Sequence, residues 1–280
     1  MKAAKFDYLR CATLEQALSA LQDGAMPAKP IAGSQSMGPM LNLRLARPGR
    51  VVDVSRLDAL RTVSADKHGI RIGAAVTHAE IEDGRHEALR HGYLQYVAGG
   101  IAYRAIRNRG TIGGSLAHAD PAADWPLALS AIDARLELSR AGATRTVRNS
   151  EFMLGAFTTL LQEGELITAV LLPPLGPSMR WGYHKLCRKT GEFAHASAAA
   201  AFDPAIGLAK VVLGALDGPP RVLEALAVDI ARRGAAAASA QALEEAVAQA
   251  MPGADAIDRS MHLAALQRCL RQALGTALEE

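Results

Sequence analysis

The segment Pro173-Pro-Leu-Gly-Pro177 constrains the fold more than any other stretch of the chain. Three prolines and one glycine in five residues stop any regular helix or strand. Before this segment, short strand-like and helical runs alternate; after it, strand runs are followed by helical runs. Strands followed by helices are typical of α+β proteins rather than of doubly wound parallel sheets. The sequence therefore predicts an α+β protein with two domains, residues 1–175 and 178–280.

Local start and stop signals divide the first part into short elements. Thr13 with Gln16 and Thr77 with Glu80 form capping boxes, each of which predicts a helix start. A helix is expected over 86–105, and the next helix begins either at Asp120-Pro121 or at Pro126. Strands are expected at 6–9, at the start of 29–36, and at 51–54, 70–74, 135–139, 144–148 and 165–172.

The second part predicts a small sheet covered by helices. Strands are expected at 181–187, 195–202 and 208–215. Apolar residues at helical spacing then predict helices at 222–233, 240–251 and 258–278.

Charge and cysteine usage exclude several classes of protein. The 280 residues carry a net charge of only +3, which gives no field suited to nucleic acid or an anionic membrane. Cys11, Cys187 and Cys269 lie far apart, which excludes a disulfide framework and a self-contained iron–sulfur cluster. The start of the chain lacks the apolar core of a signal peptide, and no run approaches the ~20 apolar residues of a membrane helix. We therefore expect a cytoplasmic protein without membrane insertion.

Two loops of small residues stand out as candidate phosphate sites. Ala32-Gly-Ser-Gln-Ser36 follows a predicted strand, and Thr111-Ile-Gly-Gly-Ser115 follows a basic stretch. Missing side chains let a backbone approach a pyrophosphate closely, so that N–H groups can point at its oxygens. Either loop alone also fits an ordinary turn. The chain has neither a dinucleotide fingerprint nor a P-loop lysine, so we expect a phosphate held between the two loops.

These loops and the residues around them resemble those of one known family. Ala32–Ser36, followed by Leu41-Asn-Leu-Arg-Leu-Ala-Arg-Pro48, is similar to the FAD-binding medium subunit of molybdenum hydroxylases, such as aerobic carbon monoxide dehydrogenase and xanthine dehydrogenase. Arg107-Asn-Arg-Gly-Thr-Ile-Gly-Gly-Ser115 and the stretch 116–124 are similar to its second signature. The resemblance extends essentially over the whole chain.

The resemblance implies a fold and a set of cofactor-binding residues. The fold is a two-part FAD-binding domain of vanillyl-alcohol-oxidase/PCMH type, followed by a smaller C-terminal sheet-and-helix domain that helps to cover the flavin. The two loops would hold the pyrophosphate, Asp124 a hydroxyl of FAD, and Lys185 the flavin ring. The implied FAD-binding residues are Ala32, Gly33, Ser34, Gln35, Ser36, Ile101, Thr111, Gly113, Gly114, Ser115, Asp124, Ile167 and Lys185.

The family also implies partners and a division of labour. A large molybdopterin-binding subunit would hydroxylate the substrate, and a small subunit with [2Fe–2S] clusters would deliver electrons to FAD on this chain, in a dimer of heterotrimers. No catalytic acid or base and no metal ligand is expected here, because the chain's task is to bind and tune the flavin. The substrate and the final electron acceptor stay open.

Simpler interpretations stand beside these. Asp124 also fits a carboxylate favoured at a helix start, Lys185 a solvated edge residue, and Ile101 and Ile167 core residues. His118 and Asp120 suggest a metal or base pair or a structural cap, and the run Arg104, Arg107 and Arg109 fits a solvated face or a phosphate-steering or docking surface. Ser34 stands where the family usually has a second glycine. The alternative functions are a free-standing flavin oxidoreductase and a non-catalytic scaffold with a degenerate FAD site.

Overall fold

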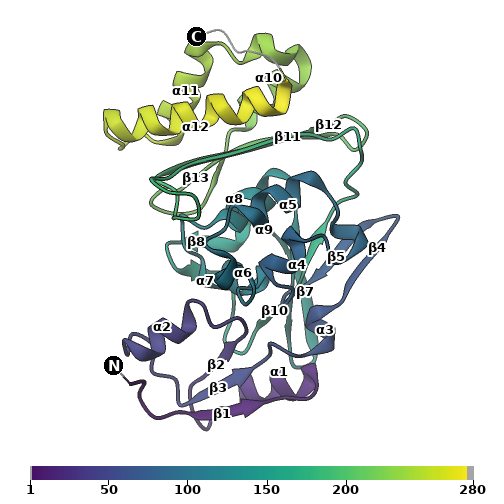
Figure 1. Ribbon diagram of the computed structural model, residues 1–280, viewed down its shortest axis with the longest axis vertical. Coiled ribbons are helices and arrows are strands. Elements are labelled where there is room, and N and C mark those ends of the chain that lie inside the picture. Colours follow the sequence, from purple (N-terminus) through teal and green to yellow (C-terminus); the bar gives the residue numbers. More distant parts are fainter. Residues whose placement is uncertain (1, 276–280) are drawn as a thin grey trace.

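The N-terminal part is a small parallel sheet. A computed structural model describes residues 2–275 of the chain (Figure 1). Three strands pair in parallel in the order β1-β3-β2: β1 (Asp7–Arg10), β3 (Arg50–Asp53) and β2 (Ala28–Ile31). Helix α1 (Leu14–Gln22) begins at Thr13, whose hydroxyl accepts from Gln16 N, and buries Leu18 and Leu21 in a small core with the sheet. Because all three strands run in one direction, the residues that follow them gather at one sheet edge.

The middle part is an antiparallel sheet with helices packed on it. The strand order is β4-β5-β10-β6-β7. The strands are β4 (Val63–Asp66), β5 (Gly69–Gly73), β10 (Leu166–Leu172), β6 (Arg135–Arg140) and β7 (Ala143–Arg148). Helix α2 (Met37–Asn42) lies beside the N-terminal strands (Figure 1). The helices of the middle part are α3 (Asp58–Arg61), α4 (His78–Glu82), α5 (Gly92–Gly99), α6 (Arg104–Arg107), α7 (Ile112–His118), α8 (Asp124–Ala131) and α9 (Asn149–Phe152), with a short 3₁₀ turn, η1 (Glu87–Leu89). The small hairpin β8 (Met153–Gly155) and β9 (Thr158–Thr159) follows α9.

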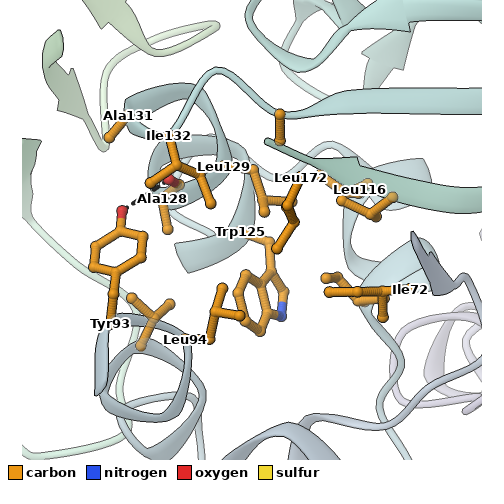
Figure 2. Packing of buried hydrophobic residues seen from close by; sticks show 14 of the residues in the cluster. Ile72, Tyr93, Leu94, Leu116, Trp125, Ala128, Leu129, Ala131, Ile132 and Leu172 are labelled. Atoms are coloured by element: carbon orange, nitrogen blue, oxygen red, sulfur yellow. Dashed lines mark hydrogen bonds between the residues drawn. The ribbon is translucent and has the colours of Figure 1, made fainter. Parts of the chain in front are cut away.

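The core of this middle part lies between its sheet and helices α5, α7 and α8. Figure 2 shows the Trp125 indole among aliphatic side chains, with the Tyr93 hydroxyl directed at the carbonyl oxygen of Ala128, to which it donates at 2.7 Å. Trp125 and Tyr93 have no exposed surface. Helix α8, which carries both Trp125 and Asp124, is therefore rigidly placed.

The C-terminal part is a four-stranded antiparallel sheet covered by three helices. The strands are β11 (Arg180–Leu186), β12 (Ala196–Asp203), β13 (Leu208–Gly214) and β14 (Arg221–Val222). The helices are α10 (Glu224–Arg233), α11 (Ala240–Ala250) and α12 (Ala256–Leu274), with a 3₁₀ turn η2 (Gly234–Ala237). Figure 1 shows this sheet between the C-terminal helices and helices α5 and α8 of the middle part.

Small residues let the central strand be covered on both faces. All eight residues of β12 are buried; Ala198 and Ala200 pack toward the C-terminal helices, whereas Ala199 and Ala201 pack toward the core around Trp125. Alternation along a strand produces these two faces. One hydrophobic cluster thus continues past the proline-rich segment, and the division at 175/178 remains a prediction.

Most expected elements form, and three local expectations differ. The helix over 86–105 is wrong: η1, α5 and α6 occupy this region as separate short pieces. Helix α8 begins at Asp124 rather than at either expected start, and Pro126 lies in its first turn, where a helix needs no backbone donor. Helix α12 runs to Leu274, and the expected continuation over 276–278 lies outside the described residues. Among residues 2–275, every helix is too short or too polar to cross a lipid bilayer.

Candidate cofactor site

The first loop presents a row of backbone donors. Residues 32–36 connect β2 to α2, and Ser34 adopts a left-handed conformation with φ 65°. Gln35 Nε2 donates to Gly33 O at 2.9 Å and braces the turn. Within residues 2–275, the N–H groups of Gly33, Ser34, Gln35 and Ser36 find no acceptor. Successive free N–H groups around a left-handed residue form a concavity that suits an anion.

The second loop is built differently. Thr111 caps α7 by accepting from Gly114 N at 3.1 Å, while Ile112 N donates to Val76 O and Gly113 N to Ala74 O. A Cβ at Gly113 would lie 2.5 Å from the Ala74 Cβ, so only glycine packs there. The amides of this helix start are therefore occupied within the chain. This loop forms a close-packed wall rather than a second row of free donors.

The first loop touches the backbone of Arg109 and Gly110, which lead into the second loop. A Cβ on Gly33 would lie 2.0 Å from the carbonyl oxygen of Arg109 and 2.9 Å from Gly110 Cα. The contact brings together segments about 80 residues apart in the sequence. Beside it lies a cleft of about 710 Å³ between the N-terminal sheet and the middle part. Its lining comprises Tyr8, Arg10, Ile31, Ala32, Gly33, Ser34, Asp53, Ser55, Arg56, Asp58, Arg61, Ala75, Thr77, Asn108, Arg109 and Thr111.

The charges of the cleft favour an anionic ligand. Asp53 accepts from Tyr8 and Arg10, and Arg61 pairs with Glu80 at 2.7 Å. Burial by itself raises the pKa of Asp53, but hydrogen bonds from Ser55, Tyr8 and Arg10 outweigh it and lower the pKa, so the carboxylate is ionised. Arg56 and Arg109 form no ion pair among the described residues. The sequence pointed to Arg109, but Tyr8 and Arg56 carried no local signal.

The basic run divides into two roles. Arg109 lines the cleft, as a phosphate-steering residue would. Arg104 and Arg107 instead pair with the carboxylates of Glu82 and Asp83 at the end of α4. Arg104, Arg107 and Arg109 therefore do not form one solvated face or one docking surface.

A second cluster forms around Asp124, the first residue of α8. Asp124 Oδ1 accepts from Lys185 Nζ at 2.8 Å and from the Tyr183 hydroxyl at 2.6 Å. Lys185 also donates to Gly100 O at 2.9 Å, next to Ile101. The side chains of Asp124 and Lys185 are 7% and 10% exposed. Lys185 is therefore a buried, paired cation and not a solvated edge residue.

The cluster keeps hydrogen-bonding capacity for a ligand. Asp124 Oδ2 accepts nothing from the described residues, and two of the three Lys185 N–H groups are used. Burial, followed by the charge of Asp124, raises the pKa of Tyr183 well above its usual value, which keeps its hydroxyl a donor. One acceptor and one donor thus stay available side by side.

The other sequence candidates have simpler surroundings. Ile167 lies on β10 in the hydrophobic core and is 3% exposed, whereas Ile101 is half-buried at the end of α5. His118 packs on Phe157 with ring centroids 5.1 Å apart, and residues 2–275 contain no metal-holding cluster of His, Cys, Asp and Glu. The cofactor contacts of Ile101 and Ile167 remain predictions.

A buried histidine, His78, contacts both Trp125, next to Asp124, and Gly110, which the first loop touches. The sequence carried no signal for this residue. Trp125 Nε1, next to Asp124, donates to His78 Nδ1 at 3.1 Å, and the His78 ring packs against Gly110. Burial, with a smaller effect from the Arg107 charge, lowers the pKa of His78 to about 4. His78 is therefore neutral at physiological pH, and its Nδ1 accepts the hydrogen bond from the Trp125 N–H. Only a contact between segments 47 residues apart reveals it.

The depressed pKa of His78 predicts acid sensitivity. The unfolded chain protonates His78 near pH 6.5 and the folded chain near pH 4, so its contribution is constant above 6.5 and stability falls as pH decreases between these values. The expected loss of unfolding free energy is roughly 3 kcal/mol. His78→Asn keeps an acceptor for Trp125 and should flatten the curve in urea denaturation between pH 6.5 and 4. The exposed control His68→Asn should leave the pH dependence of stability unchanged. If stability falls with pH equally in the two variants, the low pKa of His78 is contradicted.

Ser34 predicts a small gain on substitution by glycine. A left-handed L-residue costs about 1–2 kcal/mol, and glycine costs about 0.5–1 kcal/mol in chain entropy. With φ 65°, Ser34→Gly should therefore raise the unfolding free energy by about 0.5 kcal/mol. Ser36 has φ −108°, so Ser36→Gly relieves no strain and should destabilise. Equal losses for the two variants would argue against strain at Ser34.

Comparison with known proteins identifies the family. Residues 4–175 match the FAD binding domain in molybdopterin dehydrogenase. The 6-hydroxypseudooxynicotine dehydrogenase complex subunit alpha of Paenarthrobacter nicotinovorans is 38% identical over 199 residues, which cover 71% of this chain and 67% of that protein. The carbon monoxide dehydrogenase medium chain of Hydrogenophaga pseudoflava is 34% identical over 195 residues, with coverage of 70% and 68%.

Solved structures extend the likeness to the C-terminal part. A carbon monoxide dehydrogenase structure from Hydrogenophaga pseudoflava superposes with a TM-score of 0.88 at 28% identity, covering 98% of this chain and 99% of that chain. Quinoline 2-oxidoreductase from Pseudomonas putida 86 gives 0.86 at 28% identity, covering 100% of both. The expected α+β fold is confirmed. The chain belongs to the family of FAD-binding medium subunits of the molybdenum hydroxylases.

Proposed function

We propose that this chain is the FAD-carrying electron-transfer subunit of a molybdenum hydroxylase complex. It takes electrons from the [2Fe–2S] clusters of a small partner subunit, and a large partner subunit binds molybdopterin and the substrate. Bound FAD supplies an acceptor of single electrons that can release two together to an external acceptor. The protein's own residues bind and orient the cofactor and set the charge around it.

The free donors of the first loop carry this proposal. The N–H groups of Gly33 to Ser36, with the guanidinium of Arg109 in the same cleft and without an ion-pair partner among residues 2–275, fit the two negative charges of a pyrophosphate. Thr111 lines the same cleft, and we take Gly113, Gly114 and Ser115, which follow it, as further pyrophosphate contacts. The cleft continues to Tyr8 and Arg10, which offer an aromatic face and a guanidinium plane beyond the phosphate position.

The Asp124 cluster supports the other end of the cofactor. Asp124 Oδ2 is an acceptor for a hydroxyl, and the remaining N–H of Lys185 is a donor for a ring atom that gains negative charge on reduction. Ile101 adjoins the carbonyl that Lys185 binds and would pack along the cofactor. Ile167 would contribute an apolar or main-chain contact, as the family implies.

The three cysteines of the chain support the proposal that partner subunits carry the iron–sulfur clusters. Cys11, Cys187 and Cys269 are free and do not converge, so one-electron centres would come from another chain in a reducing, cytoplasmic setting. We place the chain in a dimer of heterotrimers, following the family.

Co-expression with the neighbouring reading frames tests the proposal. The purified protein should show flavin absorption, release FAD on denaturation, and contain two further subunits with molybdenum and iron. FAD without partner subunits would instead favour a free-standing flavin oxidoreductase. No flavin, even after incubation with excess FAD, would refute FAD carriage and favour a scaffold.

A further inference from the structure

The segment Gly100–Ala102 is held by its carbonyl groups. Gly100 O accepts from Lys185 Nζ at 2.9 Å. Ile101 O and Ala102 O both accept from Nη1 of Arg107, at 2.9 and 2.8 Å. Three successive carbonyls of a loop thus face two cations, and one of these cations belongs to the Asp124 cluster.

Arg107 is itself fixed on its other side. Its Nε and Nη2 atoms donate to the two carboxylate oxygens of Glu82 at 2.8 and 2.9 Å. The Arg107 side chain is 12% exposed and that of Glu82 is 23% exposed. A planar guanidinium can hold a carboxylate with one edge and two carbonyls with another atom, whereas a lysine ammonium has no such fork. Helix α4 therefore sets the position of the 100–102 segment through Arg107.

The 100–102 segment is strained, and it supports the loop that follows β11. Ala102 has φ 43°, a left-handed conformation that L-residues rarely adopt without compensating contacts. Gly191, with φ 90°, packs so closely on Ala102 that a Cβ would lie 2.6 Å from the Ala102 carbonyl oxygen. The loop after β11 thus rests on a backbone conformation that Arg107 stabilises.

We propose that Arg107 is a positioning residue of the flavin site. It fixes the 100–102 segment so that the Gly100 carbonyl meets Lys185 and Ile101 stands beside it, without itself touching the cofactor. The inference rests on the proposed function, since it takes Lys185 and Ile101 as cofactor contacts. It gives Arg107 a role distinct from Arg109, which lines the cleft.

Arg104 provides a matched control. It lies one turn earlier on the same short helix and pairs with the same acidic end of α4, through Asp83 at 2.7 Å and Glu82 at 2.9 Å. Its side chain is 48% exposed and donates to no carbonyl of the 100–102 segment. Arg104→Lys therefore perturbs the same ion-pair network without releasing the segment.

The test uses the full chain stripped of FAD and titrated with FAD. Arg107→Lys should weaken FAD binding by about tenfold, because hydrogen bonds to charged groups are lost. At saturating FAD it should also change the visible circular dichroism of the bound flavin, since Lys185 and Ile101 shift. Arg104→Lys should bind within about twofold of the parent with an unaltered spectrum. A purely structural role for Arg107 would lower the melting temperature and leave the saturated spectrum unchanged.

The outcomes distinguish a failure of the proposed function from a failure of the role of Arg107. If the parent chain binds no FAD, the proposed function fails and this inference with it. If the parent binds FAD and Arg107→Lys shows parental affinity and spectrum, only the role of Arg107 is refuted. If Arg107→Lys does not fold, Glu82→Gln is the second variant, because it keeps the shape of the partner of Arg107 and removes its charge. The same weakening of FAD binding and the same spectral change are expected. Parental affinity and spectrum in Glu82→Gln would again overturn the role of Arg107.

Discussion

A chain carrying Gly33→Ala should lose its FAD and much of its stability. The new Cβ would lie 2.0 Å from Arg109 O, 2.7 Å from Arg109 C and 2.9 Å from Gly110 Cα. All three are backbone atoms, so no side-chain rotation relieves the clash, and the first loop must move away from residues 109–110. Overpacking of this kind costs about 1–3 kcal/mol. Flavin-to-protein ratio after gel filtration and urea denaturation measure the two effects.

Two other glycines serve as controls for this result. A Cβ on Gly24 would meet nothing within 4 Å, so Gly24→Ala should retain flavin and stability. A Cβ on Gly114 would meet only the Thr111 hydroxyl, at 2.7 Å, so Gly114→Ala should weaken the helix cap and leave the contact of Gly33 with residues 109–110 intact. Because Gly114 is itself a proposed FAD-binding residue, this variant is a control for stability alone. A Gly33→Ala chain with parental flavin content would show that FAD binding does not need the close contact between Gly33 and residues 109–110.

Asp124→Ala should destabilise the protein by about 3–5 kcal/mol, because it leaves a buried cation without its partner. Lys185 and Tyr183 both donate to Asp124 Oδ1, and the Lys185 side chain is 10% exposed. If Asp124 served only as a favourable charge at the start of α8, the loss would be about 0.5 kcal/mol. Unfolding free energy from urea denaturation of the FAD-free chain separates the two cases.

An exposed ion pair provides the comparison. Asp229 pairs with Arg233 on one face of α10, with side chains 43% and 60% exposed, and Asp229→Ala should cost less than about 0.5 kcal/mol. Asp124→Asn keeps an oxygen for the Tyr183 hydroxyl but removes the charge opposite Lys185, so an intermediate loss is expected. A loss below about 1 kcal/mol for Asp124→Ala would mean that Lys185 finds another acceptor.

Elements marked by neighbouring residues were predictable from the sequence. The capping box of Thr77 and Glu80 forms as expected, with Thr77 Oγ1 accepting from Glu80 N and Glu80 accepting from Thr77 N. At Thr13 the cap forms, but the Gln16 side chain accepts from Ala12 N instead of completing the box. These signals are reliable because each hydrogen bond joins residues within about four positions.

Element lengths in the middle part were less predictable. Residues 86–105 read as one helix from composition, yet the structure breaks them at Arg90 and again at Gly100–Ala102. The second break is stabilised by Arg107 and Lys185, the latter 85 residues from the carbonyl it binds. Helical periodicity contains no information about such distant donors, and tertiary contacts outweigh local preference.

The sequence alone determined the family, the two small-residue loops and the residue types suited to a flavin dinucleotide. Tertiary structure decided which groups stay free to bind. Within the described residues it left the amides of Gly33 to Ser36 without acceptors, while Val76 and Ala74 occupy those of Ile112 and Gly113. It also gave Arg107 an ion pair with Glu82 and placed Arg109 in the cleft. The physical reason is that hydrogen-bonding capacity is shared among neighbours in space, and those neighbours lie on segments that the chain brings together only on folding.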